Sequence, residues 1–241
     1  MGADNPPPLL QKATLVKGFK TFKKIIEQAH RMGAPHDRVV DRERVQLKLR
    51  TVPVTWGVPF DEIGFNRFWT KFIATANMMP WDGWLPMEGT YLQKARNEIH
   101  NKFLKSNSPY LMMLDSDIMF PPDLVEKLMA YDLPVVGGWY KDKNSSEHWP
   151  CVYDFEKEED GLSMFRHRDH PGKGLEKVDA MGGGCWLMKR EAAEALGEKP
   201  YGDNIAKGGE DFILCRKLMR LGIPLHVDWS IDCAHWGVGF Y

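Results

Sequence analysis

The 241-residue sequence lacks the marks of several protein classes. It contains no apolar run close to the roughly 18 residues that a membrane-spanning helix needs. Its first residues do not form a charged segment that leads into an apolar one, as a secretory signal does. It also has no internal repeat, and no low-complexity tract beyond three successive prolines. These absences predict a protein that has no transmembrane segment and stays in the cytoplasm.

Cysteine is scarce, and its spacing is not that of a metal-binding motif. No two cysteines are separated as in Cys-x-x-Cys, so a zinc site built from thiolates is not indicated. Scattered cysteines in a cytoplasmic protein are usually reduced thiols that pack in the core. We expect this state for all four of them: Cys151, Cys185, Cys215 and Cys233.

A large excess of one charge is also missing, because 32 Lys and Arg residues nearly balance 33 Asp and Glu residues. Hydrophobic residues make up 43% of the chain and charged residues 27%, which is typical of a globular protein and excludes a disordered or fibrous one. The charge is nevertheless unevenly distributed, with a net +6 in residues 1–50 and a net −7 in the remainder. A basic arm therefore precedes an acidic body.

We predict this arm at residues 1–49 and a second domain at residues 50–241. After Pro6–Pro8, apolar residues at near-helical spacing alternate with lysines as far as Gly33, which predicts a basic amphipathic helix. Such a helix is suited to peripheral contact with membrane phosphates, to nucleic acid or to a protein partner. The commoner alternative is that the helix packs its apolar face on the body and leaves its lysines in solvent.

Predicted strands and helices alternate along the second domain, which is the pattern of an α/β fold with a sheet covered by helices. We expect parallel pairing in the first half and mixed pairing in the second, where the strands are shorter. Gly57–Pro59 predicts a break in the first strand. The clearest predicted segments are strands at 50–60, 110–114, 134–140, 148–155 and 178–190, helices at 61–76, 90–104, 121–130 and 209–222, and a charged insert at Glu156–Asp160.

Two carboxylates, Asp115 and Asp117, follow the apolar segment YLMML at an interval of one residue. Ligands of open α/β sheets bind beyond the carboxyl ends of the strands, so a polar cluster here predicts a site. A bend after the strand would turn both carboxylates toward one cation, and oxygen ligands suit Mg²⁺ or Mn²⁺ with positions left for a diphosphate. The alternative is that the two acids cap the turn and the helix that follows.

A glycine-rich segment, AMGGGCW, is a second candidate for ligand contact. Gly182 and Gly183 would let the backbone approach a bound molecule closely. Trp186 follows them, and its ring is suited to stacking on the face of a sugar. We expect these residues at the donor site.

The order of the motifs resembles that of the GT-A glycosyltransferases. YLMMLDSDIMFPPDLVEKLM, between KARNEIHNKFL and PVVGGWY, is similar to the nucleotide-sugar half of that fold, where an Asp-x-Asp motif holds a divalent metal against the donor diphosphate. KGGEDFILCRKLMRLG is similar to the Gly-Gly-Glu-Asp segment of inverting members, including the β-1,4-galactosyltransferases. CAHWG resembles a late segment with a metal-binding histidine, and the whole resemblance spans about Val52 to Gly237.

The resemblance implies roles for the residues that match it. Asp115 and Asp117 would bind the metal together with His235, whose neutral imidazole suits Mn²⁺. Arg96 and Asn97 match an Ala-Arg-Asn segment that lies near the donor, and the guanidinium of Arg96 suits a phosphate. A surface ion pair would also explain the arginine.

Glu210 and Asp211 begin a predicted helix, where the helix dipole favours acids even without chemistry. The resemblance implies that Asp211 is the base that accepts the proton of the acceptor hydroxyl and that Glu210 contacts the acceptor. It further implies a GT-A (Rossmann-like) fold with a mixed, mainly parallel sheet flanked by helices, in a small bacterial or phage enzyme. The expected reaction is metal-dependent, inverting transfer of a sugar from a UDP- or GDP-sugar to an acceptor hydroxyl.

Three other functions stay open. The basic arm could bring the same active site to DNA or RNA, although the acidic body argues against it; steep salt dependence of binding would support it. A nucleotidyltransferase also places paired acids at a sheet edge, but it would release pyrophosphate and gives the Gly-Gly-Glu-Asp segment no role. A non-catalytic carbohydrate- or partner-binding module would bind sugar with or without EDTA and has no use for a base.

Overall fold

The computed structural model describes residues 52–60, 82–88, 91–159, 162–203 and 209–235. By its internal contacts the chain divides into two units, Met1–Leu47 and Lys48–Tyr241, and every described residue lies in the second. The predicted arm and the helix predicted at 61–76 lie outside the described residues, so both stay predictions. Within the described residues, no helix is long and apolar enough to cross a membrane.

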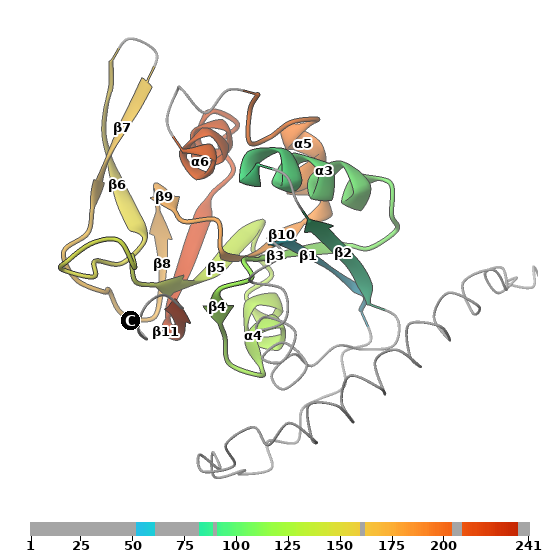
Figure 1. The fold of residues 1–241 in the computed structure, drawn as a ribbon, viewed down its shortest axis with the longest axis horizontal. Coiled ribbons are helices and arrows are strands. Elements are labelled where there is room, and N and C mark those ends of the chain that lie inside the picture. The colour runs from blue at the N-terminus through green and yellow to red at the C-terminus, as the bar shows by residue number, and fades with distance from the viewer. Residues whose placement is uncertain (1–51, 61–81, 89–90, 160–161, 204–208, 236–241) are drawn as a thin grey trace, which may run out of the picture. The chain divides into compact units, whose positions relative to one another are not determined.

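A mixed β-sheet forms the centre of the described part (Figure 1). Its strands are β1 (Val54–Phe60), β2 (Gly83–Glu88), β3 (Tyr110–Leu114), β4 (Ile118–Met119), β5 (Val135–Tyr140), β8 (Leu175–Val178), β10 (Cys185–Lys189) and β11 (Leu225–His235). They lie in the order β2-β1-β3-β10-β5-β11-β4, and β8 also pairs with β11. β1 is parallel to β2 and β3, and β5 is parallel to β11, whereas β4, β8 and β10 are antiparallel to their neighbours.

The antiparallel strand β10 makes the sheet less parallel than the sequence predicts. Leu187 of β10 lies between Met112 of β3 and Val136 of β5. The direction of β10 follows from where it begins, because Cys185 lies opposite Leu114, the last residue of β3. The chain therefore runs back along the sheet from the edge at which β3 ends. The mixed α/β architecture and the mixed pairing expected in the second half are confirmed, whereas a sheet that is mainly parallel as a whole is wrong, because β4, β8 and β10 all pair antiparallel.

The break predicted in the first strand at Gly57–Pro59 is also wrong, since β1 continues to Phe60. β3 pairs with β1 only from Val54 to Gly57, while β2 follows β1 to its end. Beyond Gly57, one edge of β1 has no strand partner among the described residues. Pro59 thus lies in a part of β1 that has a strand partner on one side among the described residues, a position in which proline is tolerated.

Helices cover both faces of the sheet (Figure 1). The described helices are α3 (Leu92–Leu104), α4 (Leu124–Ala130), α5 (Arg190–Leu196) and α6 (Glu210–Arg220). Ile99 and Phe103 of α3, four residues apart on one helix face, are fully buried in a core cluster shared with α5 and α6. Leu124 and Leu128 of α4 belong to the cluster on the other face. The helices predicted at 90–104, 121–130 and 209–222 are confirmed.

A second, smaller sheet contains β6 (Val152–Glu159), β7 (Leu162–His167) and β9 (Ala180–Met181) in the order β7-β6-β9. β6 and β7 form a hairpin that projects from the body in Figure 1. The segment predicted as a charged insert supplies the end of β6, so its charges lie on a strand. All four cysteines are free thiols, as predicted; three are buried and Cys151 is half-buried.

Candidate active site

The carboxyl end of β3 is the point from which the site is built. The N–H of Asp115 donates to the Gly184 carbonyl at 2.9 Å, and the N–H of Ile118 donates to the Asp115 carbonyl at 3.1 Å. This turn leads the chain into β4, where Ile118 lies opposite His235 of β11. The register of two strands thus brings Asp117 beside a histidine from the far end of the domain.

A buried arginine gathers three carboxylates from two elements. Arg96 of α3 is 1% exposed, and its Nη2 donates to both carboxylate oxygens of Asp115 at 2.8 Å. Its Nη1 donates to Oε1 of Glu210 at 2.8 Å and also to Oδ1 of Asp211. We call Arg96, Asp115, Glu210 and Asp211 the Arg96 cluster. It joins the end of β3 to the first turn of α6.

The Arg96 cluster contains more negative than positive charge. Burial lowers the pKa of Arg96, but Asp115, Asp211 and Glu210 raise it well above its ordinary value, so the guanidinium stays charged. Burial raises the pKa of Asp211 to about 6, opposed by the charge of Arg96 and supported by those of Glu210 and Asp115. A carboxylate with such a pKa accepts a proton more readily than an ordinary aspartate does at neutral pH. Its side chain is 26% exposed, so a substrate can reach it.

The glycine segment lies against these carboxylates. A side-chain carbon added at Gly183 would overlap Oδ1 of Asp211 and lie 2.7 Å from Nη1 of Arg96. One added at Gly184 would lie 3.0 Å from Oδ2 of Asp115. The sequence predicts that this backbone lies close to a bound molecule. In the structure it lies close to the side chains of Asp211 and Asp115 instead. Only glycine leaves room for the Arg96 cluster here.

A second ionic group surrounds Asp117. Nε2 of His235 lies 3.3 Å from Oδ2 of Asp117, and Nζ of Lys143 forms an ion pair with the same oxygen. Burial raises the pKa of Asp117, but hydrogen bonds with His235 and Lys143 outweigh burial and bring the pKa to about 2. We call Asp117, Lys143 and His235 the Asp117 group. Its acid is a carboxylate throughout the physiological pH range.

The Asp117 group has a donor set that fits a divalent cation. Nδ1 of His235 lies 2.8 Å from the Lys141 carbonyl, so a proton assigned to Nδ1 donates to that carbonyl. A divalent cation would replace the Nε2 proton that hydrogen-bonds to Asp117, and outer hydrogen bonds such as that to Lys141 orient metal-binding histidines. Among the described residues, no three His, Cys, Asp or Glu side chains are placed to hold a metal ion, and Asp115 points to Arg96 instead. Two protein ligands suffice for Mg²⁺ or Mn²⁺ when substrate phosphates and water supply the others.

Two of the residues expected to contact the donor lie elsewhere. Asn97 receives the N–H of Tyr201 on Oδ1 at 3.1 Å and donates from Nδ2 to the Gly202 carbonyl at 2.8 Å, so its amide holds a loop in place. Trp186 is 1% exposed and belongs to the core, where no sugar face can reach its ring. Both expectations fail for the same reason. One face of strand β10 and one face of helix α3 are buried, and the local sequence does not determine which residues lie on that face.

Two residues of the site carry no sequence signal that would have identified them. The hydroxyl of Tyr140 accepts the Gly184 N–H at 3.0 Å, and its ring meets that of His235 edge-on at a centroid distance of 5.1 Å. Burial raises the pKa of Tyr140 well above its ordinary value, so it stays neutral while it links the glycine segment to the histidine. Lys143 lies in a loop whose sequence, KDKN, is typical of any polar turn.

Neither a protein-family model nor a curated protein sequence matches the chain. Solved structures resemble it in fold. The crystal structure of A197 from STIV matches 77% of this chain and 86% of its own, with a TM-score of 0.51 and 18% sequence identity. The crystal structure of GalNAc-T7 with UDP, GalNAc and Mn²⁺ matches 76% of this chain, with a TM-score of 0.51 and 13% identity. The mixed α/β fold is consistent with a GT-A-like fold. The match covers 43% of the GalNAc-T7 chain, and at these identities the likeness concerns the fold alone.

Proposed function

We propose that the protein is a metal-dependent glycosyltransferase that moves a sugar from a nucleoside-diphosphate sugar to an acceptor hydroxyl with inversion. The observation that carries the proposal is the junction of the Arg96 cluster and the Asp117 group through neighbouring acids, Asp115 and Asp117. In the proposal, Asp211 acts as the base, and Asp117 and His235 supply the ligands of a cation close to it. The GT-A-like fold supports the proposal, because a structure with that fold was obtained with UDP, GalNAc and Mn²⁺.

Asp211 carries the acid–base chemistry in the proposed reaction. Its carboxylate accepts the proton of the acceptor hydroxyl while the hydroxyl oxygen attacks the anomeric carbon of the donor sugar. A carbon–oxygen bond forms on one face of that carbon, and the bond to the diphosphate oxygen breaks on the other. The nucleoside diphosphate leaves with the bonding electron pair. A single displacement of this kind inverts the anomeric configuration.

Two neighbours of Asp211 assist this step: Arg96 orients its carboxylate, and Glu210 contacts the acceptor. Arg96 fixes the orientation of its carboxylate and keeps part of its charge neutralised, so its pKa does not rise beyond about 6. Glu210 begins the same helix turn, and in the proposal its free oxygen hydrogen-bonds to the acceptor. Holding an acceptor hydroxyl close to its base is itself a large part of catalysis.

In this proposal, the Asp117 group binds the leaving group, the nucleoside diphosphate, through a metal ion. Asp117 and His235 would bind Mn²⁺ or Mg²⁺, which when bound neutralises charge that develops on the diphosphate. The Lys141 carbonyl keeps the imidazole of His235 oriented toward Asp117. Lys143 adds a second positive charge on a flexible stem, so its ammonium can turn from Asp117 to a phosphate oxygen.

Calorimetric titration of UDP and of GDP into the full-length protein tests the donor site. Each nucleotide is titrated with Mn²⁺ and again with EDTA. We expect one nucleotide to bind, and to bind only with the metal. If neither binds under either condition, the donor-site proposal is wrong.

A variant pair links that titration to the Asp117 group. Asp117→Asn removes the charge that faces the cation, so we expect metal-dependent nucleotide binding to be lost. Asp123→Asn is the matched control, because Asp123 lies in the same segment and, among the described residues, its carboxylate forms an ion pair with Lys127 alone. Equal binding by both variants would move the metal site away from Asp117.

A further inference from the structure

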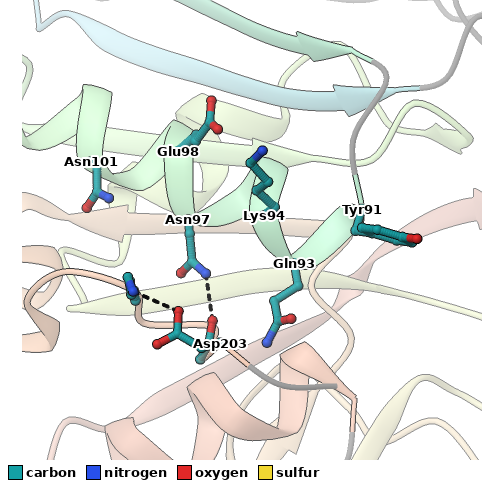
Figure 2. A pocket seen from close by; sticks show the side chains of 9 residues that line it. Tyr91, Gln93, Lys94, Asn97, Glu98, Asn101 and Asp203 are labelled. Carbon is teal, nitrogen blue, oxygen red and sulfur yellow. Dashed lines mark hydrogen bonds and ion pairs between the residues drawn. The ribbon is translucent and has the colours of Figure 1, made fainter. Parts of the chain in front are cut away.

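A pocket of about 610 Å³ lies along one side of α3 (Figure 2). Its lining comes from the helix and from the loop after α5: Tyr91, Gln93, Lys94, Asn97, Glu98, Asn101, Lys199, Gly202 and Asp203. The volume is in the range of sites that take small molecules or a few sugar units. We call it the α3 pocket. The proposed reaction has so far given it no role.

One residue separates the α3 pocket from the Arg96 cluster. The Tyr201 ring lies beneath the guanidinium of Arg96, with the guanidinium carbon 5.8 Å from the ring centroid. The backbone of the same residue faces the pocket residues, since its carbonyl accepts Gln93 Nε2 at 2.8 Å and its N–H donates to Asn97. Tyr201 thus contacts residues of both the α3 pocket and the Arg96 cluster, and helix α3 contributes to both, which makes the two neighbours.

The lining of the α3 pocket is polar, and its charges cancel. Lys94 and Glu98 bring one charge of each sign, and Lys199 and Asp203 form an ion pair at 2.9 Å. No hydrogen bond or ion pair joins the side chain of Lys94 or Glu98 to another described residue, so both are open to a ligand. This balance does not favour a phosphate-rich ligand such as nucleic acid.

An aromatic ring and an unpaired amide oxygen complete the chemistry. Tyr91 stands at the edge of the pocket with 80% of its surface exposed, and Figure 2 shows its ring beyond the start of α3. The C–H face of a pyranose is apolar and packs on such a ring, while its hydroxyls need polar partners. Oδ1 of Asn101, a residue that lines the pocket, is buried and has no hydrogen-bond partner among the described residues, so it is a polar atom that still needs one.

We propose that the α3 pocket binds sugar units of a neutral oligosaccharide acceptor, one or more units away from the hydroxyl that reacts. The inference rests on the proposed glycosyltransferase function and names the substrate class of the same site. Tyr91 stacks on one pyranose ring, and Glu98 and Lys94 hydrogen-bond to its hydroxyls. The occupant is neither the nucleotide nor a nucleic acid.

Ligand-observed NMR with the full-length protein tests this proposal. The probes are short neutral oligosaccharides of glucose, galactose, N-acetylglucosamine and N-acetylgalactosamine, without nucleotide and with EDTA. We expect at least one probe to bind, because acceptor recognition does not use the metal. Tyr91→Ala should weaken that binding about tenfold, the effect of losing one well-packed aromatic contact. Glu98→Gln should weaken it by a smaller factor.

Two control variants make similar changes at residues that do not line the pocket. Leu92→Ala removes an apolar side chain that is 42% exposed and does not line the pocket, and Glu191→Gln removes an exposed acid on α5. Both should bind the oligosaccharide as the unchanged protein does. If Leu92→Ala weakens binding as much as Tyr91→Ala, the pocket is not the binding site.

Calorimetry with the nucleotide and Mn²⁺ separates failure of this inference from failure of the proposed function. If no oligosaccharide binds while nucleotide binding depends on the metal, the acceptor subsite is wrong and the donor site stands. If Tyr91→Ala abolishes nucleotide binding, the α3 pocket belongs to the donor and the inference is overturned. If neither ligand binds, both the glycosyltransferase proposal and the acceptor subsite are wrong.

Discussion

The two acids of the Asp-x-Asp segment lie one residue apart and have opposite surroundings. Asp115 faces Arg96, whose side chain is 1% exposed and is held by three carboxylates. Asp117 faces Lys143, whose side chain is 31% exposed and ends a flexible stem. The buried guanidinium is held in place, whereas the Lys143 ammonium can turn away from Asp117. In the proposed function, Asp117 is therefore the acid that is left for a metal ion.

This difference also separates two tasks on one edge of the sheet. In the Arg96 cluster, the guanidinium holds the two acids that begin α6, Glu210 and Asp211. Burial raises the pKa of Asp211 to about 6. The Asp117 group keeps the pKa of its acid near 2 through His235 and Lys143. Two carboxylates whose surroundings move their pKa values apart are suited to different roles, one to proton transfer and one to cation binding. The predictions below test each side of this division.

Removing the base should have the largest effect. Asp211→Asn cannot accept a proton, so we expect turnover to fall by about 10²–10⁴-fold while metal-dependent nucleotide binding stays unchanged. Steady-state kinetics and nucleotide calorimetry measure the two quantities. Glu210→Gln is the matched control, and it should affect the acceptor KM more than kcat. Normal turnover in Asp211→Asn would show that another group is the base.

Removing the buried guanidinium of Arg96 should have the second largest effect. Arg96→Met leaves three carboxylates together without their partner, and breaking a buried ion pair in this way costs about 3–5 kcal/mol of the free energy of unfolding. Urea unfolding followed by circular dichroism measures the change. As a control, Arg220→Met removes an arginine that is 59% exposed and pairs with Glu158, and it should cost less than about 1 kcal/mol. Equal losses would mean that the Arg96 cluster does not stabilise the fold.

The raised pKa of Asp211 predicts the pH dependence of turnover. An aspartate ordinarily loses its proton near pH 3.8, but here the base form appears only as the pH rises through about 6. Below that value, kcat/KM should fall about tenfold per pH unit, because the protonated acid cannot accept a proton. Asp117 stays ionised over the same range, so its titration does not contribute to this acid limb. An acid limb near pH 4 would contradict the assigned environment of Asp211.

Much of the site could be predicted from local sequence because it lies at the ends of strongly patterned elements. Asp115 and Asp117 follow an apolar strand, and Glu210 and Asp211 begin an amphipathic helix, so each pair could be placed at a terminus before any tertiary contact was known. The helices around them were predicted for the same reason. Their roles in binding and catalysis stay proposals.

The rest depends on pairings between distant segments, which local pattern does not encode. Arg96 was expected at a phosphate, yet its fork is occupied by three acids of this chain. Trp186 was expected at a sugar, yet β10 turns that position into the core. Lys143 and Tyr140 belong to the site only because β5 and its following loop lie beside β11. The central antiparallel strand was missed because direction follows from connections rather than composition.

The smallest expected effect concerns the Lys143 ammonium. Lys143 and a divalent ion would compete for the same oxygen of Asp117, and a partly exposed ion pair of this kind contributes little. Lys143→Met should therefore strengthen Mn²⁺ binding without nucleotide by about two- to fivefold, as measured by electron paramagnetic resonance titration. Lys157→Met is the control, because that lysine is 59% exposed and pairs with Glu159 on β6. Weaker Mn²⁺ binding in Lys143→Met would mean that the ammonium supports the metal site instead of competing with the metal. The claim that Lys143, unlike Arg96, gives way to another cation would then be wrong.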